Sequence, residues 1–125
     1  MKYWLKPANV KKYDLFNAFR NLKEIDWASR NKFSVGDIVY IYCSLPEQRI
    51  SHKCEVVAIN IDEDDAIDDS KYSKVKSFNT SYKCVRLKLL EEISNTVRLA
   101  EIDLKFCRST RTISIDQVKK IDEMI

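Results

Sequence analysis

The sequence predicts an α+β fold in which a mixed or antiparallel sheet curls into a barrel, with short helices near both ends of the chain. Three observations support this. Runs with the two-residue alternation of strands dominate the middle of the chain, and apolar residues at helical spacing occur towards both termini. The strand-like runs are separated by turns and not by regular helical crossovers. Such connections favour a barrel of about five to six strands over a doubly wound parallel sheet.

The first expected elements are a strand, a helix and a loop. The strand covers residues 2–6 and ends at Pro7, which has no N–H to donate to a central ladder. Asp14 can cap a short helix that ends at Asn21, because apolar residues recur on one face of that segment. Residues 23–34 are mostly polar and predict a loop.

The later elements begin after the Gly36-Asp37 turn. Strands are expected over residues 38–43, 52–61 and 82–90, where apolar and polar side chains alternate. Residues 97–106 fit a strand or a helix equally well. Ser114 can cap a final helix over residues 115–124, whose apolar residues recur at helical spacing.

Length and composition indicate one globular domain, 1–125. The chain has 125 residues, of which 45% are hydrophobic and 33% charged, as in ordinary folded proteins. No apolar run approaches the roughly 20 residues that a membrane span needs. The apolar stretch at the N-terminus is also shorter than the about 7–15 residues of a secretory signal. We therefore expect a cytoplasmic protein with no membrane partner.

The charges are unevenly distributed along the chain. Six acidic side chains fall within residues 62–69, and removing them from the net charge of +3 leaves +9 on the rest. The first 36 residues hold eight basic and three acidic side chains, a net charge of +5. Concentrated positive charge attracts phosphate, so a nucleic-acid partner is an alternative to a merely solvated lysine-rich surface.

The acidic segment does not predict a calcium site. An EF-hand loop beginning at Asp62 would need Gly at its sixth position and Glu at its twelfth, where Ile67 and Ser73 stand. Residues 62–80 therefore read as an acidic and polar loop insertion, flexible and solvated. The four cysteines also lack the closely spaced pairs of a zinc site, so no metal and no cofactor is expected. They are Cys43, Cys54, Cys84 and Cys107.

Catalysis finds little support in the sequence. Because Gly36 is the only glycine, the chain has neither a G-x-S-x-G elbow nor a glycine-rich phosphate loop. His52, the only histidine, has no companion carboxylate nearby in the sequence. Catalysis by a Cys–His pair stays open, without a third group to orient it. We expect no catalytic residue and a protein that is not an enzyme.

Three motifs in the first half of the chain carry a family resemblance. The first strand contains Tyr3-Trp4-Leu5, a tryptophan segment reads Trp27-Ala28-Ser29-Arg30-Asn31, and the Gly36-Asp37 turn leads to a strand that ends in Tyr42-Cys43-Ser44. In this order the motifs resemble the EVE domain family of the PUA-like superfamily. They are more distantly similar to YTH domains, which bind 6-methyladenine in RNA.

The resemblance implies a fold and a function. The fold would be a PUA-like mixed β-barrel, with residues 1–125 forming a single EVE/PUA-like domain. The function would be to bind modified DNA or RNA by accommodating a flipped, modified base between aromatic side chains. EVE-like domains are often recognition domains of restriction or defence systems, which implies a fused or separate effector nuclease as a partner.

The resemblance also implies site residues. The base pocket would draw on Trp27, Ser29, Asn31, Asn9, Tyr42 and Ser44. Phosphates would be held by Lys6, Lys11, Lys12, Arg30 and Lys32. Ala28 and Ser29 replace a glycine-containing step that is usual in EVE proteins. For the second aromatic wall the candidates are Trp4, Tyr72 and Phe78.

Three functional hypotheses follow. The favoured one is a non-catalytic reader of a modified base. The alternative is a PUA-like RNA- or protein-interaction domain without a base pocket, in which Trp27 is buried. The third is an enzyme or small-molecule binder that uses His52 or a cysteine. A pocket with open aromatic walls beside Trp27 favours the first hypothesis, and a filled pocket there favours the second. A histidine that points into a cleft beside a thiol or a carboxylate favours the third.

Overall fold

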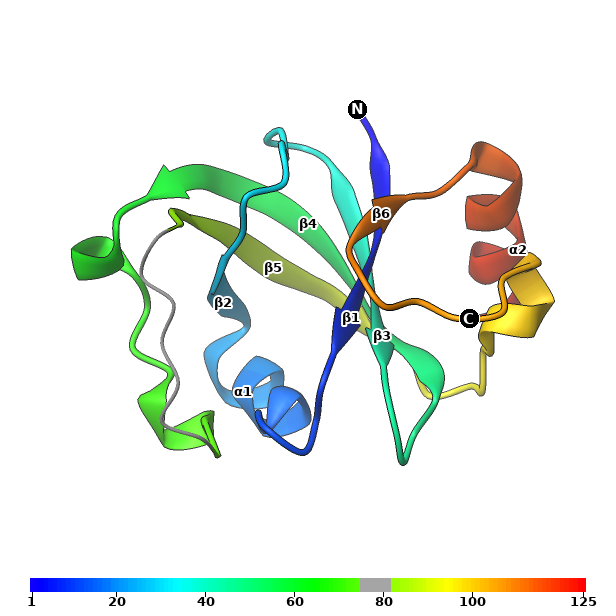
Figure 1. Ribbon diagram of the computed structural model, residues 1–125, viewed down its shortest axis with the longest axis horizontal. Helices are drawn as coiled ribbons and strands as arrows, with labels where there is room; N and C mark the ends of the chain where they lie inside the picture. Colours follow the sequence, from blue (N-terminus) through cyan, green and yellow to red (C-terminus); the bar gives the residue numbers. More distant parts are fainter. Residues whose placement is uncertain (75–81) are drawn as a thin grey trace.

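The computed structural model describes residues 1–74 and 82–125, which form a six-stranded mixed sheet with short helices on either side (Figure 1). The strands are β1 (Tyr3–Ala8), β2 (Glu24–Ala28), β3 (Ile38–Cys43), β4 (Arg49–Ile61), β5 (Cys84–Glu92) and β6 (Arg111–Thr112). Their order in the sheet is β2-β5-β4-β3-β1-β6, and only β1 and β3 run parallel. The sheet is mixed, as expected, but it is not closed into a barrel.

The helices begin at the side chains that the sequence indicated. Helix α1 (Leu15–Leu22) begins after Asp14, whose carboxylate accepts a hydrogen bond from the backbone N–H of Asn17. Helix α2 (Ile115–Met124) begins after Ser114, which forms a reciprocal capping box with Gln117. Three short 3₁₀ turns complete the fold: η1 (Glu63–Asp65), η2 (Ser70–Tyr72) and η3 (Leu99–Ile102). Within the described residues, no helix is long and apolar enough to cross a membrane.

Two hydrophobic cores lie on opposite faces of the sheet, because side chains alternate along each strand. The α1-side core includes Trp4, Phe19, Ile25, Val39 and Ile41. The α2-side core includes Leu5, Tyr40, Ile50, Val118 and Ile121. In Figure 1, α1 lies with β2 at one end of the sheet, and α2 packs beyond β1 and β6 at the other. The candidate site lies on the α1 side.

The Gly-Asp turn anchors β1 to the start of β3. Gly36 has a φ of 96°, a left-handed conformation that glycine adopts without strain. The Asp37 carboxylate accepts hydrogen bonds from the Lys2 N–H, the Ser34 N–H and the indole of Trp4, at 2.9–3.0 Å. Burial alone would raise the pKa of Asp37, but these hydrogen bonds hold its pKa below the usual value. The Gly36-Asp37 turn therefore has a structural role, since it holds β1 against the start of β3.

Several expectations are confirmed and others are corrected. The ranges expected for β3 and α2 agree with the structure. Strand β1 continues through Pro7 to Ala8, because β6 pairs only with Trp4 and Leu5 and no partner strand in the described part of the chain meets Pro7 on that side. The expected loop over 23–34 is wrong for its first half, which forms β2. Residues 97–106 form the 3₁₀ turn η3 and irregular chain.

The first part of the acidic segment is anchored and not freely solvated. The carboxylate of Asp26, on β2, accepts a hydrogen bond from the Ile67 N–H at 2.8 Å and pairs with the Arg86 guanidinium. Tyr72 is buried in the α1-side core. The segment therefore folds over α1 and β2. The end of the expected insertion, residues 75–80, lies outside the described residues.

Candidate nucleic-acid interface

Trp27 lies near the open edge of the sheet. It belongs to β2, the edge strand, and pairs with Val85 of β5. Its side chain is on the same face as Ile25, since the two residues are two apart, and it packs half-buried against the α1-side core. The ring of Tyr13 lies beside it, with centroids 6.0 Å apart and planes tilted by 39°. The structure thus gives Trp27 an aromatic neighbour.

Lys6 reaches Trp27 from the other end of the sheet. It lies on β1, which is separated from β2 by three strands, yet its Nζ is 4.1 Å from the centroid of the Trp27 ring. Lys6 is only 8% exposed. Burial lowers its pKa from 10.5 to about 8, and the neighbouring Cys107 opposes this only in part. The contact bridges β1 and β2, which would pair with each other if the sheet closed into a barrel. We call this gap between β1 and β2 the seam.

Tyr13 and the acidic segment lie beside this seam and contact each other. The Tyr13 hydroxyl donates a hydrogen bond to the Asp69 carboxylate at 2.6 Å. Burial and this hydrogen bond raise the pKa of Tyr13 far above its usual value, so the phenol stays neutral. The Lys74 N–H donates to the Lys12 carbonyl at 2.8 Å, which joins Lys74 to the turn that precedes α1.

Four of the expected site residues surround a separate hollow beyond the end of β2. Its volume is about 310 Å³, and it is lined by Ser29, Arg30, Asn31, Lys32, Phe33, Ile59, Asn60, Lys83, Cys84 and Val85. The Ser29 hydroxyl accepts a hydrogen bond from the Asn31 N–H at 3.1 Å, so it shapes the turn. Trp27 is not part of this lining. The structure therefore separates Ser29 and Asn31 from Trp27.

The other three expected pocket residues have structural roles. Asn9 is exposed, and its side-chain oxygen accepts a hydrogen bond from the Lys11 N–H at 3.0 Å, which forms a turn. The Ser44 hydroxyl donates to the Ala8 carbonyl at 3.2 Å and joins β3 to β1. Tyr42 packs against the α2-side core, on the opposite face of the sheet from Trp27. The structure does not bring Tyr42 and Trp27 together.

The expected phosphate-binding residues also divide into two groups. The exposed ones are Lys11, Lys12, Arg30 and Lys32. None of these four forms an ion pair among residues 1–74 and 82–125, so their charges are available to a partner. Lys6 differs, because its side chain is largely buried and its ammonium lies over the Trp27 ring.

The aromatic side chain beside Trp27 is Tyr13, which was not among the candidates named from the sequence. Trp4 is buried, donates its indole N–H to Asp37 and packs on Phe33, with centroids 4.5 Å apart. Tyr72 is also a core residue, and Phe78 lies outside the described residues. One sequence signal does point to Tyr13. It directly precedes the helix cap, where an apolar residue often packs back onto the structure.

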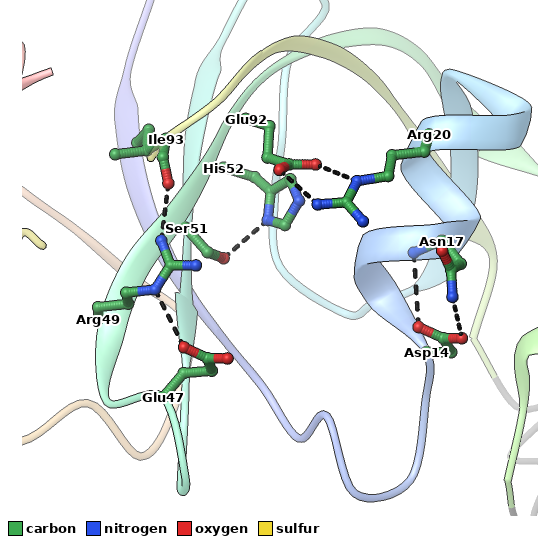
Figure 2. Close-up of polar contacts among 9 residues, drawn as sticks. All are labelled: Asp14, Asn17, Arg20, Glu47, Arg49, Ser51, His52, Glu92 and Ile93. Carbon is green, nitrogen blue, oxygen red and sulfur yellow. Dashed lines mark hydrogen bonds and ion pairs between the residues drawn. The ribbon is translucent and has the colours of Figure 1, made fainter. Parts of the chain in front are cut away.

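His52 is buried in a polar chain that solvent does not reach. Figure 2 shows its imidazole next to Ser51, whose Oγ is 2.7 Å from Nδ1. Ser51 Oγ is in turn 3.0 Å from the Cys43 thiol. His52 and Cys43 are both 0% exposed, and burial lowers the pKa of His52 to about 4. Neither residue is among those that line the hollow beyond β2.

The neighbours of His52 are apolar rings and one ion pair. The rings of Phe16 and Phe19 have centroids 4.8 and 5.0 Å from that of the imidazole. Arg20 makes two hydrogen bonds of 2.8 Å to Glu92 beside it, as Figure 2 shows. His52 Nε2 is buried and has no hydrogen-bond partner in the described part of the chain. The imidazole, which belongs to β4, therefore packs against helix α1.

Comparisons with known proteins identify the fold. No protein-family model matches the sequence, and no curated protein matches it. Solved structures do match over nearly the whole chain. A hypothetical protein from Leishmania major is 21% identical with a TM-score of 0.69, and the match covers 99% of this chain and 94% of that one. An ASCH protein from Zymomonas mobilis is 11% identical with a TM-score of 0.67, and the match covers 98% and 95%.

A third match is human THYN1, solved in complex with DNA that contains 5-methylcytosine. It is 13% identical with a TM-score of 0.67, and the match covers 97% of this chain and 95% of that one. At these identities the matches show the fold. The chain therefore has the PUA-like α+β fold that ASCH domains and THYN1 share, and the expected PUA-like fold is confirmed.

Proposed function

We propose that this protein is a non-catalytic nucleic-acid-binding module that takes a flipped, modified base against Trp27. The observation that carries the proposal is the contrast between the two tryptophans. Trp4 is buried and hydrogen-bonded, as a core residue should be, whereas Trp27 stays half-buried at the open seam with Tyr13 beside it. The similarity of fold to THYN1, solved with 5-methylcytosine DNA, supports the same conclusion.

The energetics of such a site are favourable. Removing a base from its stack costs a few kcal/mol, and stacking on one aromatic side chain returns roughly 1–3 kcal/mol. A methyl group buried against the rings adds about 0.8 kcal/mol, or about a fourfold preference for the methylated base. Two rings are therefore enough to offset flipping and to favour a modified base without any chemical step.

The exposed cations supply affinity and not selectivity. Lys11 and Lys12 flank the turn that leads to Tyr13, and Arg30 and Lys32 follow Trp27 along the chain. Their unpaired charges can neutralise phosphates of the strand that carries the flipped base. The hollow of about 310 Å³ lined by Arg30, Lys32 and Lys83 offers a place for a phosphate next to that base.

The test is fluorescence-polarisation binding to matched DNA and RNA oligonucleotides. These carry no modification, 5-methylcytosine, 5-hydroxymethylcytosine or 6-methyladenine. Trp27→Ala should abolish the preference for one modified oligonucleotide, whereas Trp27→Phe keeps a ring and should retain part of it. Thermal melting of both variants controls for folding.

A specific observation favours the alternative of an RNA- or protein-interaction domain without a base pocket. The ammonium of Lys6 covers the Trp27 ring in this structure, so the site is filled by the protein itself. Under this alternative, binding in the same assay would ignore modification, fall steeply with salt and survive Trp27→Ala. The restriction or defence role and the effector nuclease stay predictions from the family resemblance.

A further inference from the structure

The Lys6 side chain is largely buried, and its ammonium has no hydrogen-bond acceptor among the described residues. The residue is 8% exposed, and its Nζ lies over the Trp27 ring at 4.1 Å. An ammonium has three N–H donors. Among residues 1–74 and 82–125, no acceptor or carboxylate within hydrogen-bonding or ion-pairing distance receives any of them. The other lysines with a charge partner show the contrast, since Lys53, Lys83 and Lys120 each contact a carboxylate at 2.6–3.2 Å.

A lysine in this largely buried position carries a cost for the protein. Desolvation disfavours its charge, and the attraction to the indole face returns only about 0.5–2 kcal/mol. A methionine or leucine at this position would pack on Trp27 without that cost. A ligand that brings hydrogen-bond acceptors to the seam would offset this cost.

The position of the ammonium defines where those acceptors must lie. At 4.1 Å from the ring centroid, Nζ occupies the layer in which a base stacked on Trp27 would lie. A base that enters must move the ammonium sideways, and the flexible four-carbon stem of lysine permits this. The ammonium then lies at the edge of the stacked base, where it meets the hydrogen-bonding groups of the base.

We propose that Lys6 is a specificity-determining residue, which donates hydrogen bonds to acceptors on the edge of the base stacked on Trp27. Lysine is a donor only, so it favours a base edge on which a carbonyl oxygen adjoins a ring-nitrogen acceptor. Cytosine and its 5-modified forms present such an edge, with O2 beside N3. In 6-methyladenine the exocyclic group is instead a methylated N–H donor. Guanine also presents such a pair, O6 beside N7, but of the modified bases compared for this site only the 5-modified cytosines do, and they are the proposed ligand class. This inference rests on the proposed function of the Trp27 site.

The test uses Lys6→Met, with Lys11→Met as the matched control. Both changes remove one lysine charge from the same segment, but Lys11 is exposed, whereas Lys6 lies over the Trp27 ring. Fluorescence polarisation then compares oligonucleotides carrying 5-methylcytosine and 6-methyladenine. Lys6→Met should lose about 10- to 100-fold in affinity for 5-methylcytosine, the range expected for a hydrogen bond from a charged group, and should lose the discrimination between the two. Lys11→Met should weaken both equally.

A pH series gives a second readout that a merely structural lysine would not affect. Because burial lowers the pKa of Lys6 to about 8, the free protein loses this proton as the pH rises through 8, and the affinity for 5-methylcytosine should fall there. Tyr13 and Cys107 have raised pKa values, so they do not share this step. Lys11→Met should keep the pH dependence, and Lys6→Met should lose it.

The outcomes separate this inference from the proposed function. If the unchanged protein prefers a modified base and Lys6→Met binds equally well or more tightly, then Lys6 only covers the ring and the inference is wrong, while the proposed function stands. A preference for 6-methyladenine would also overturn the inference alone. If the unchanged protein prefers no modified base, both are wrong.

Discussion

Acidification is expected to destabilise this protein through His52. The imidazole is 0% exposed, between the rings of Phe16 and Phe19, and its Nδ1 is 2.7 Å from Ser51 Oγ. Protonation would place a charge among these rings, and the nearby Glu92 carboxylate is already engaged by Arg20. Burial therefore lowers the pKa of His52 from 6.5 to about 4 in the folded state.

The sign and size of the effect follow from this difference. Between pH 6.5 and about 4 the unfolded chain binds a proton at His52 that the folded protein does not. Stability conferred by the neutral imidazole is thus complete above pH 6.5, falls as the pH drops and levels off below about 4. A difference of about 2.5 pKa units corresponds to about 3 kcal/mol, a large part of the stability of a small domain.

The assay is urea unfolding at a series of pH values from 7.5 to 4, with His52→Phe as the comparison. Phenylalanine fills a similar space between the same rings but does not titrate. His52 is the only histidine in the chain, so the loss of stability between pH 6.5 and 5 should be much smaller in this variant. An equal loss in both proteins would refute the argument and assign the acid sensitivity to carboxylates.

Three further predictions concern the polar contacts. Asp37→Ala removes the acceptor of three buried or half-buried N–H donors and should lower the free energy of unfolding by about 3 kcal/mol in urea melts, with the loss of β1 pairing visible in amide exchange. Arg86→Met leaves the Asp26 side chain, which is 1% exposed, without its ion-pair partner and should lower the free energy of unfolding by about 3 kcal/mol. Lys83→Met breaks an exposed ion pair and should lower it by less than about 1 kcal/mol. Equal losses in the two variants would contradict this prediction. Lys11→Met should reduce the salt slope of log Kd by about 1 without changing base preference.

The local parts of the fold could be predicted from the sequence because they depend on short-range chemistry. Ser114 and Gln117 form a capping box, and the apolar spacing that follows marks the helix. Gly36 permits the turn that starts β3. Strand β2 was missed since it has only five residues and the positions that alternate with Ile25 and Trp27 are mostly charged. Its alternation of Ile25 and Trp27 becomes clear only when β5 pairs beside it.

The candidate site was harder to predict because it depends on contacts between distant segments. Lys6 looks like any surface lysine in the sequence, and only the curvature of the sheet brings it to Trp27, across three intervening strands. Tyr42 shows the opposite error. It belongs to the family-like motif, but the alternation along β3 directs it to the α2-side core. The motif predicts the path of the backbone, but two side chains can meet only if they point to the same face of the sheet.

The open seam explains why the proposed site is at this place. In a closed barrel, β1 and β2 would hydrogen-bond to each other, and the Trp27 ring would be covered by backbone. Here the second half of β1 has no partner strand on that side among the described residues, and Pro7 lies on this edge, where it cannot recruit another strand. The seam is held by a side-chain contact, the Lys6 ammonium on Trp27, and a flexible side chain can move aside for a ligand far more easily than a strand can.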